Sequence, residues 1–253
     1  MSGNLTYDTV LIGMLAMAPI SFAVLSWWRA PYGRYATAGG RFALPARIGW
    51  ILMEAPASLA MLWFYARGSH RGDLVPLVLL GLWQCHYVDR AFVYPLRMRV
   101  KPGSRMPWSI AVSSIAFHVV NCYLCGGWIA EYGRYPTGWL TEPRCVAGVA
   151  VFASGFAINR WADRVLRNLR GPGESGYKIP RGGLYEWVSC PNFLGEILTW
   201  VGWAIASWSL AGLSFALMTA ANLIPRARQH HRWYLERFPD YPKRRRAIVP
   251  CLL

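Results

Sequence analysis

The sequence has few charged residues, and acidic residues are the scarcer kind. Charged residues make up 15% of the 253 positions and hydrophobic residues 55%. This composition is too apolar for an ordinary soluble domain. Because a helix satisfies its own backbone hydrogen bonds in lipid, the composition predicts an all-α, polytopic membrane protein.

Cysteine is also sparse, with six residues, and its spacing supports no metal or redox site. Cys122 and Cys125 form one C-x-x-C pair, but the pair lies inside an apolar run. His230 and His231 have no carboxylate at metal-ligand spacing. We therefore expect buried thiols at the cysteine pair and no metal. Internal repeats and low-complexity tracts are absent too, which favours one domain over residues 1–253.

Long apolar runs predict about seven transmembrane helices, since each span needs about 20 mostly apolar residues. The predicted spans are 7–28, 46–66, 74–94, 108–130 and 143–159, followed by two shorter ones within 192–225. The polar and small residues of 207–212 permit a tight turn between the last two. One long tilted helix over 197–224 is the alternative.

The basic residues predict the orientation of these spans. Most of the 27 Lys and Arg residues fall in alternate connections and in the C-terminal tail. The opposite connections hold only Arg67, Arg71, Arg134 and Arg144. Because basic residues accumulate on the cytoplasmic side, we expect the N-terminus outside and the C-terminus in the cytoplasm. The net charge of +15 thus reflects orientation in the membrane and attraction for an anionic ligand, not nucleic-acid binding.

Glu54 is an ionisable residue near the middle of the second predicted span. Such a residue is costly in a membrane and marks a functional site by default, although a carboxyl pinned to a neighbouring helix is the plainer interpretation. An apolar site favours the neutral acid, which can donate a hydrogen bond.

Tyr87 lies in an unusually polar stretch of the third span, residues 85–90. The plainer interpretation is an interfacial tyrosine, with Asp89 and Arg90 marking the cytoplasmic helix end. If the second and third spans are neighbours, Tyr87 and Glu54 could place two donors on an oxygen that gains negative charge. This arrangement suits a carbonyl compound, and the surrounding apolar helices would provide the cavity for a lipid-like molecule.

Residues 171–176 fit the G-x-G-x-x-G pattern. The dinucleotide fingerprint requires a preceding strand and a following helix, whereas this motif follows a basic helical segment. A Rossmann fold is therefore a poor interpretation. The glycines could still let the backbone approach a phosphate.

Polar, carboxylate and basic side chains recur through the C-terminal third. They are Asn159, Asp163, Arg170, Tyr177, Asn192, Glu196, Arg226, His230 and Tyr234. Residues 159 and 163 share one helix face, as do residues 226, 230 and 234, because each step is four positions. We expect the two faces to converge on the cytoplasmic side, either as solvated charged faces or as a ligand site.

The sequence resembles the steroid 5α-reductase (3-oxo-5α-steroid 4-dehydrogenase) family. The resemblance rests on PRGGL at 180–184, NFLGEI at 192–197, ASWS at 206–209, HHRWYL at 230–235, DYPK at 240–243, APYGRY at 30–35, LPAR at 44–47 and RAFVY at 90–94. It implies a seven-helix membrane enzyme that uses NADPH to reduce the C4–C5 double bond of 3-oxo-Δ4-steroids. Met53 and Lys178 depart from the vertebrate pattern, and the loop 97–105 aligns poorly.

The resemblance also assigns roles to residues of this chain. Glu54 and Tyr87 would be catalytic and would polarise the C3 carbonyl of the steroid. The residues implied to contact NADPH are Tyr32, Asn159, Asp163, Arg170, Tyr177, Asn192, Glu196, Arg226, His230 and Tyr234. Residues 1–130 would mainly hold the steroid and residues 143–253 the cofactor.

Two other functions remain open from the sequence alone. One is a membrane methyltransferase of the isoprenylcysteine type, which would bind S-adenosylmethionine and would not need Glu54. The other is a non-catalytic sterol-binding membrane protein. We expect membrane lipid as a partner, with no nucleic acid and no obligate protein partner. The membrane would be the inner membrane of a bacterium or the endoplasmic reticulum of a eukaryote.

Overall fold

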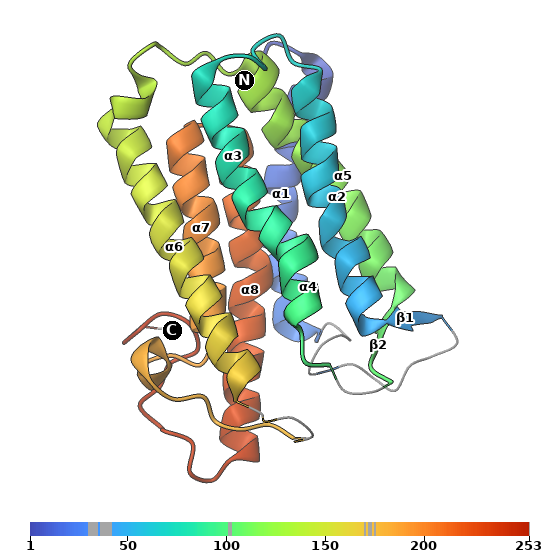
Figure 1. Ribbon diagram of the computed structural model, residues 1–253, viewed down its shortest axis with the longest axis vertical. Helices are drawn as coiled ribbons and strands as arrows, with labels where there is room; N and C mark the ends of the chain where they lie inside the picture. The colour runs from blue at the N-terminus through green and yellow to red at the C-terminus, as the bar shows by residue number, and fades with distance from the viewer. Residues whose placement is uncertain are drawn as a thin grey trace.

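The computed structural model describes residues 1–29, 35, 42–100, 103–169, 171, 174 and 176–252. These residues are mostly helical, as predicted, and the long helices run side by side in one bundle (Figure 1). The α-helices are α1 (Leu5–Trp27), α2 (Ala46–Ala66), α3 (Leu74–Val88), α4 (Tyr94–Arg97), α5 (Trp108–Gly127), α6 (Pro143–Asn168), α7 (Pro191–Ser207) and α8 (Leu210–Arg237). The shorter elements are the π-helices η2 (Asp89–Val93) and η3 (Trp128–Tyr132), the 3₁₀ helices η4 (Trp139–Thr141) and η5 (Gly183–Glu186), and the strands β1 (Ala43–Pro45) and β2 (Arg105–Pro107).

Five helical segments of the described chain are long and apolar enough to cross a membrane. They are Leu5–Trp27, Ala46–Ala66, Trp108–Tyr132, Pro143–Asn168 and Leu210–Arg237. Each overlaps a predicted span, although α6 continues well past the predicted end at residue 159 and α8 well past the predicted end at residue 225. The helices α3 and α7 have 15 and 17 residues, and α3 continues without a break into η2 and α4.

A tight turn separates α7 from α8, so the alternative of one long helix is wrong. Trp208 has a left-handed backbone with φ of 44°, which ends α7. The Ser209 hydroxyl then accepts a hydrogen bond from the Gly212 amide at 2.9 Å and caps the start of α8. The polar residues of the predicted break therefore act as helix-ending and helix-starting signals.

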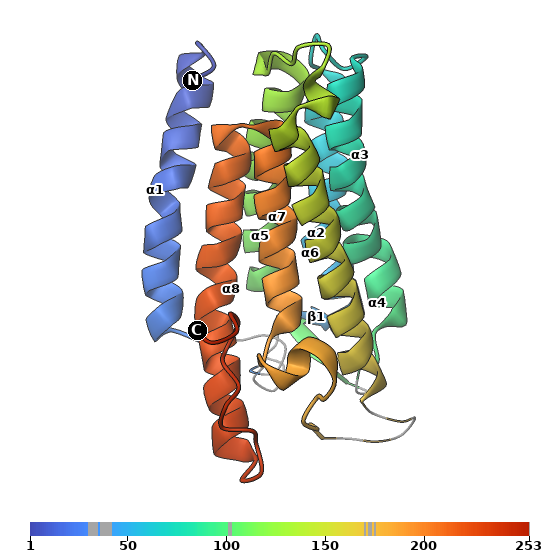
Figure 2. The same cartoon turned by 90° about the vertical axis from the view of Figure 1, so that its left-hand side faces the viewer.

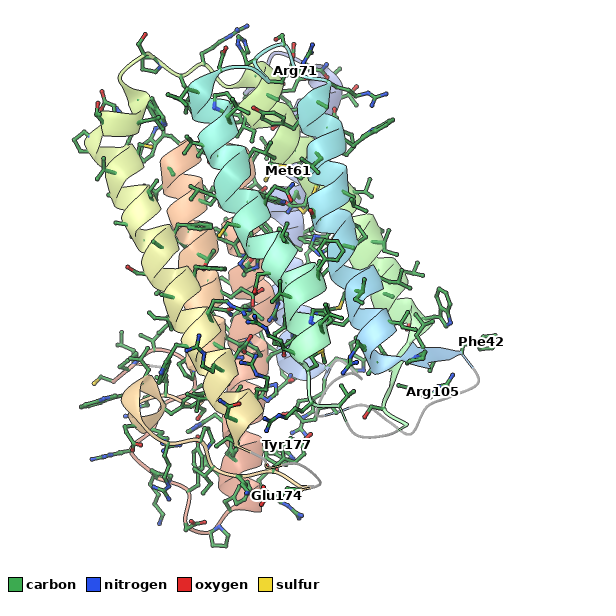
Figure 3. All side chains as sticks on the ribbon, viewed as in Figure 1. Phe42, Met61, Arg71, Arg105, Glu174 and Tyr177 are labelled. Carbon is green, nitrogen blue, oxygen red and sulfur yellow. The ribbon has the colours of Figure 1, made fainter. Side chains whose placement is uncertain are left out.

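The two ends of the bundle hold different segments of the chain. Arg71 lies at the end that holds the N-terminus, while Glu174 and Tyr177 lie at the opposite end (Figures 1 and 3). The antiparallel pair of β1 and β2 places the starts of α2 and α5 together, with Leu44 opposite Met106. The helix α1 packs along α8 (Figure 2). The Gln229 side chain of α8 donates to the Leu25 carbonyl of α1 at 2.7 Å.

Buried tryptophans join the central helices. The indole N–H of Trp83 in α3 donates to the Ala57 carbonyl of α2 at 2.9 Å. The indole of Trp203 in α7 donates to the Leu79 carbonyl of α3 at 3.0 Å. Both rings are fully buried, so each contributes a large apolar surface and also satisfies its one polar atom. These bonds make α3 a neighbour of both α2 and α7.

The helices α6 and α7 approach each other backbone to backbone. A Cβ atom added at Gly202 would lie 2.2 Å from the Phe152 amide nitrogen, and one added at Gly155 would lie 2.4 Å from that of Thr199. Small residues permit such close packing between membrane helices. This approach brings the polar face of α6 against the first turns of α7.

The substitution Gly202→Ala tests this packing. The added methyl group meets α6 backbone that cannot move aside cheaply, so we expect a loss of about 1–3 kcal/mol and a lower melting temperature in detergent. Gly81→Ala is the matched control, because nothing lies within 4 Å of a Cβ at Gly81. A melting temperature of Gly202→Ala that equals that of Gly81→Ala would contradict the packing argument.

Candidate functional site

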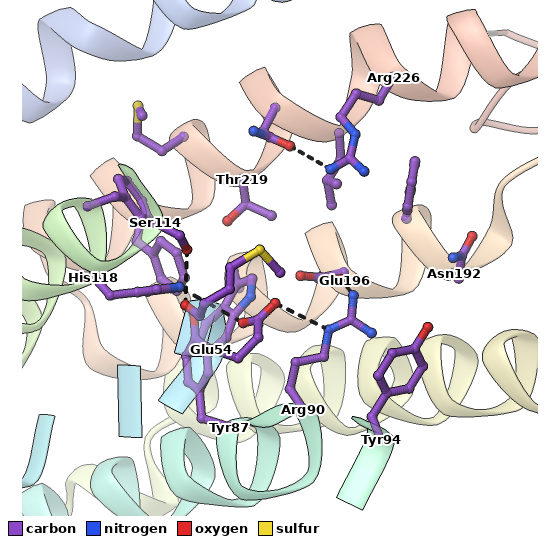
Figure 4. Close-up of a pocket in the computed structure, with 18 of the residues that line it drawn as sticks. Glu54, Tyr87, Arg90, Tyr94, Ser114, His118, Asn192, Glu196, Thr219 and Arg226 are labelled. Atoms are coloured by element: carbon purple, nitrogen blue, oxygen red, sulfur yellow. Dashed lines mark hydrogen bonds and ion pairs between the residues drawn. The ribbon is translucent and has the colours of Figure 1, made fainter. Parts of the chain in front are cut away.

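A cavity with a volume of about 280 Å³ lies inside the bundle (Figure 4). It is lined by residues of α2, α3, η2, α4, α5, α6, α7 and α8. Six of the residues predicted from the sequence line it together, namely Glu54, Tyr87, Asp163, Asn192, Glu196 and Arg226. Both predicted catalytic residues and four of the ten predicted cofactor-binding residues thus share one cavity.

Glu54 projects into this cavity from α2, and its side chain is 13% exposed. Figure 4 shows Glu54 between His118 and Arg90. The Nε2 atom of His118 lies 3.9 Å from Oε2 of Glu54, and the Nε atom of Arg90 lies 3.9 Å from Oε1. Neither distance is short enough for a hydrogen bond, so neither donor is committed to the Glu54 carboxyl.

Tyr87 reaches the same cavity from α3, and α3 is a neighbour of α2 as the predicted pairing requires. The hydroxyl of Ser58 donates to Oε1 of Gln84 at 2.5 Å, and Nε2 of Gln84 donates to the Ser58 carbonyl at 3.0 Å. The ring of Tyr87 packs against Trp200 with a centroid distance of 5.3 Å. A rigid aromatic wall therefore supports the phenol.

The polar face of α6 is buried against α7, so the solvated-face interpretation is wrong for this helix. Asn159 is 2% exposed and Asp163 is 6% exposed. The amide of Asn159 donates to the Asn192 carbonyl at 2.9 Å, and the amide of Asn192 donates to Oδ1 of Asp163 at 3.2 Å. Nδ2 of Asn159 also lies 3.5 Å from Oε2 of Glu196. These four residues form one network between the helices.

The predicted face of α8 extends away from the cavity. Arg226 lines the cavity and donates to Oδ1 of Asn222 at 3.0 Å. His230 packs against Phe193 with a centroid distance of 5.6 Å, and Tyr234 stacks on Tyr241 at 5.0 Å, but neither lines the cavity. The face therefore leads from the cavity to the end of the bundle.

Three further residues that were predicted to contact the cofactor are not among the described residues that line the cavity. Tyr177 is half exposed and packs against Trp233 of α8 with a centroid distance of 4.9 Å, outside the cavity. Tyr32 and Arg170 lie outside the described residues. Their relation to the cavity stays a prediction.

The glycine motif follows α6 and not a strand, so the Rossmann interpretation is wrong. In its described part, the Gly171 amide donates to Oε2 of Glu174 at 2.8 Å. The Lys178 ammonium donates to the same oxygen at 2.6 Å. The bond from Lys178, with that from Gly171, holds the pKa of Glu174 below its usual range.

The two cysteines of the C-x-x-C pair are buried thiols, as predicted. Sγ of Cys122 donates to the Ala57 carbonyl at 3.3 Å, and Sγ of Cys125 lies 3.6 Å from the Ala211 carbonyl. Both thiols bond to backbone of neighbouring helices, which gives them a packing role.

Arg90 and His118 are two cavity residues that the sequence did not indicate. Arg90 is 9% exposed, and its Nη1 donates to Oδ2 of Asp163 at 3.0 Å. Asp89 pairs with Arg160 of α6, so neither Asp89 nor Arg90 simply marks a solvated helix end. His118 is 6% exposed, and its buried Nδ1 has no hydrogen-bond partner within the described part of the chain. The signals for Arg90 were its place three residues after Tyr87 and in the RAFVY segment at 90–94, and neither gave it a role in the site. Nothing in the sequence separated His118 from a packed core residue.

The fold and the cavity define a class of protein. It is a helical membrane protein whose bundle encloses ionisable groups in a ligand-sized cavity, an arrangement typical of membrane enzymes and transporters.

Comparisons with known proteins narrow this class to one family. Residues 104–253 match the family described as 3-oxo-5-alpha-steroid 4-dehydrogenase. A 3-oxo-5-alpha-steroid 4-dehydrogenase 1 from Bos taurus is 42% identical over 94% of this chain and 93% of its own length. A steroid 5-alpha-reductase DET2 from Solanum lycopersicum is 38% identical over 97% of this chain and 96% of its own length. The chain belongs to the 3-oxo-5-alpha-steroid 4-dehydrogenase family, and the resemblance seen in the sequence is confirmed.

The geometry predicts that the cavity carboxyls differ in their effect on stability. Asp163 forms a buried ion pair, so Asp163→Asn leaves Arg90 partly uncompensated and should cost about 3–5 kcal/mol. Glu54 has no hydrogen bond to either neighbouring base, so Glu54→Gln should change the melting temperature little. Thermal unfolding of both variants in detergent makes the comparison. Equal losses of stability would show that Glu54 is as strongly paired as Asp163.

Proposed function

We propose that this chain reduces the C4–C5 double bond of a 3-oxo-Δ4-steroid to the 5α-3-oxosteroid, with NADPH as the reductant. The observation that carries the proposal is the shared cavity. Glu54 and Tyr87 line it together with Asp163, Asn192, Glu196 and Arg226, in a family whose members are named for this activity. No observation favours the methyltransferase or the non-catalytic alternative.

The described residues fit a dinucleotide phosphate in their chemistry. A second cavity of about 220 Å³ is lined by Arg99 and Arg167 and shares Tyr94, Asp163 and Asn192 with the first. Arginine is suited to phosphate because its planar guanidinium donates two parallel hydrogen bonds. Polar groups therefore extend from the cavity to basic side chains at the end of the bundle. NADPH has its nicotinamide at one end and its phosphates further along, so polar groups followed by basic side chains match the order of its parts.

The proposed cofactor contacts follow this order. Asn159, Asp163, Asn192, Glu196 and Arg226 would hold the nicotinamide end. The proposal assigns the more distant contacts to Tyr32, Arg170, Tyr177, His230 and Tyr234. When bound, NADPH supplies the hydride.

In the proposed mechanism Glu54 and Tyr87 activate the substrate. The phenol of Tyr87 and the protonated carboxyl of Glu54 donate hydrogen bonds to the C3 carbonyl oxygen. Withdrawal of electrons through the conjugated system makes C5 electrophilic, so that C5 accepts hydride and the oxygen gains the negative charge of an enolate. Protonation at C4 then completes the reaction and consumes one proton per turnover. Phe117, Phe215 and Met218 supply apolar surface for the steroid rings.

The membrane arrangement is part of the proposal. We infer that the continuous run α3, η2 and α4 and the helix α7 also cross the membrane, which gives seven spans with the five long ones. The N-terminus would face outward and the C-terminus the cytoplasm, where the cofactor is available. Residues 1–130 would mainly hold the steroid and residues 143–253 the cofactor. The membrane would be the inner membrane in a bacterium and the endoplasmic reticulum in a eukaryote.

Turnover of the purified protein tests the proposed reaction. We expect detergent-solubilised protein with NADPH and testosterone to give the 5α-dihydrosteroid in step with the loss of nucleotide absorbance. Mass spectrometry identifies the product. Steroid binding without reduction would instead support the non-catalytic alternative.

Two variants test the catalytic pair. Tyr87→Phe removes one donor to the developing oxyanion and should lower kcat by about 10²–10³-fold. Glu54→Gln replaces the acidic O–H with a weaker amide N–H donor, so it should also lower kcat, and NADPH binding should persist in both variants. Tyr65→Phe is the control, since the Tyr65 hydroxyl donates to the Arg71 carbonyl at the far end of α2. Full activity of both cavity variants would overturn the mechanism.

A further inference from the structure

Arg90 lies close to carboxyls on both the proposed catalytic side and the proposed cofactor side of the cavity. Its Nη1 lies 3.0 Å from Oδ2 of Asp163 on α6, and its Nη2 lies 3.5 Å from Oε2 of Glu196 on α7. Its Nε lies 3.9 Å from Oε1 of Glu54 on α2. One guanidinium, with a side chain 11% exposed, therefore joins the proposed acid to two proposed cofactor contacts.

The local structure holds this guanidinium in place. Arg90 belongs to the π-helix η2, a form that is rare and concentrated at functional sites. Its guanidinium carbon lies 4.9 Å from the ring centroid of Trp50 and 4.8 Å from that of Tyr94. The Trp50 indole also donates to the Arg90 carbonyl at 3.2 Å. Aromatic neighbours thus hold both the guanidinium and the backbone carbonyl of Arg90.

The charges around the cavity indicate which carboxyl stays neutral. Its described lining contains three carboxyls, those of Glu54, Asp163 and Glu196, and two guanidiniums, those of Arg90 and Arg226. It also contains the imidazole of His118, which is 6% exposed and is counted as neutral because burial disfavours its charged form. An unbalanced charge inside a membrane bundle is costly, so two carboxylates against two guanidiniums is the favoured state. Asp163 and Glu196 lie nearest to Arg90 and are the ionised pair. Glu54 is the remaining carboxyl, and the Nε of Arg90 that faces it has no hydrogen-bond partner among the described residues.

We infer that Arg90 is a positioning residue that acts on both sides of the proposed reaction. It holds Asp163 and Glu196 in place for the cofactor, and because these carboxylates take up its charge, Glu54 stays protonated and can donate to the substrate oxygen. The inference rests on the proposed function and adds to it how the acid is kept neutral.

The substitution Arg90→Lys tests the positioning role, since it keeps the charge but loses the planar fork. Loss of one charge-assisted hydrogen bond corresponds to about a 10- to 100-fold effect. We expect changes of this size as a higher Kd for NADPH, measured by nucleotide fluorescence, and a lower kcat. The matched control is Arg160→Lys, because Arg160 also ties η2 to α6, through Asp89, but does not line the cavity. The control should bind and turn over like the wild type.

Infrared spectroscopy tests the charge assignment separately from turnover. The carbonyl stretch of a protonated carboxyl should appear in the wild type and vanish in Glu54→Gln. In Glu196→Gln, Arg90 has one carboxylate fewer, so Glu54 should ionise and the same band should vanish. A purely structural role for Arg90 would leave this band unchanged in Glu196→Gln.

The outcomes separate this inference from the proposed function. A wild type that makes no 5α-steroid refutes the proposed reaction, while the nucleotide affinity and the infrared band still report on Arg90. Four results would overturn the inference: wild-type affinity and kcat in Arg90→Lys, equal losses in Arg90→Lys and Arg160→Lys, no Glu54 band in the wild type, or a Glu54 band that persists in Glu196→Gln.

Discussion

The pairing of one buried guanidinium with carboxylates from several helices is the constraint on which the polar end of the bundle depends. An unpaired charge in this environment costs several kcal/mol, so η2, α6 and α7 must meet at hydrogen-bonding distance. The pairs of Arg90 with Asp163 and with Glu196 meet this requirement. Close packing at Gly155 and Gly202 allows it, because only glycine lets the α6 and α7 backbones come so near. Packing and electrostatics therefore select the same helix arrangement.

This arrangement gives the cavity two chemically different ends. Arg226 and Asn192 line the cavity, and α8 continues past Arg226 to Arg237. Phe117, Phe215 and Met218 provide apolar surface on other parts of the wall. A dinucleotide and a lipid-like molecule need opposite surroundings, and one cavity that borders both is suited to a reaction between them.

The sequence predicted much of the fold because span length and turn chemistry are local properties. The apolar runs gave the five long helices, and the residues of 207–212 indicated the turn at Trp208. Arg90 was missed because a basic residue after an apolar run usually marks a cytoplasmic helix end, and only tertiary contacts distinguish a buried ion pair from that. Four-residue spacing correctly placed Arg226 and His230 on one face. It could not tell that only Arg226 reaches the cavity, since distance from the cavity depends on how helices pack.

Isotope transfer tests the central claim most directly. The protein would be incubated with NADPH deuterated at the transferable C4 position of the nicotinamide and a Δ4-3-oxosteroid, and the product examined by mass spectrometry and NMR. The account predicts cofactor deuterium at C5 on the α face, and a solvent proton at C4. Label at C3 or C4, or a reduced steroid without label, would contradict hydride transfer to the conjugated C5 position.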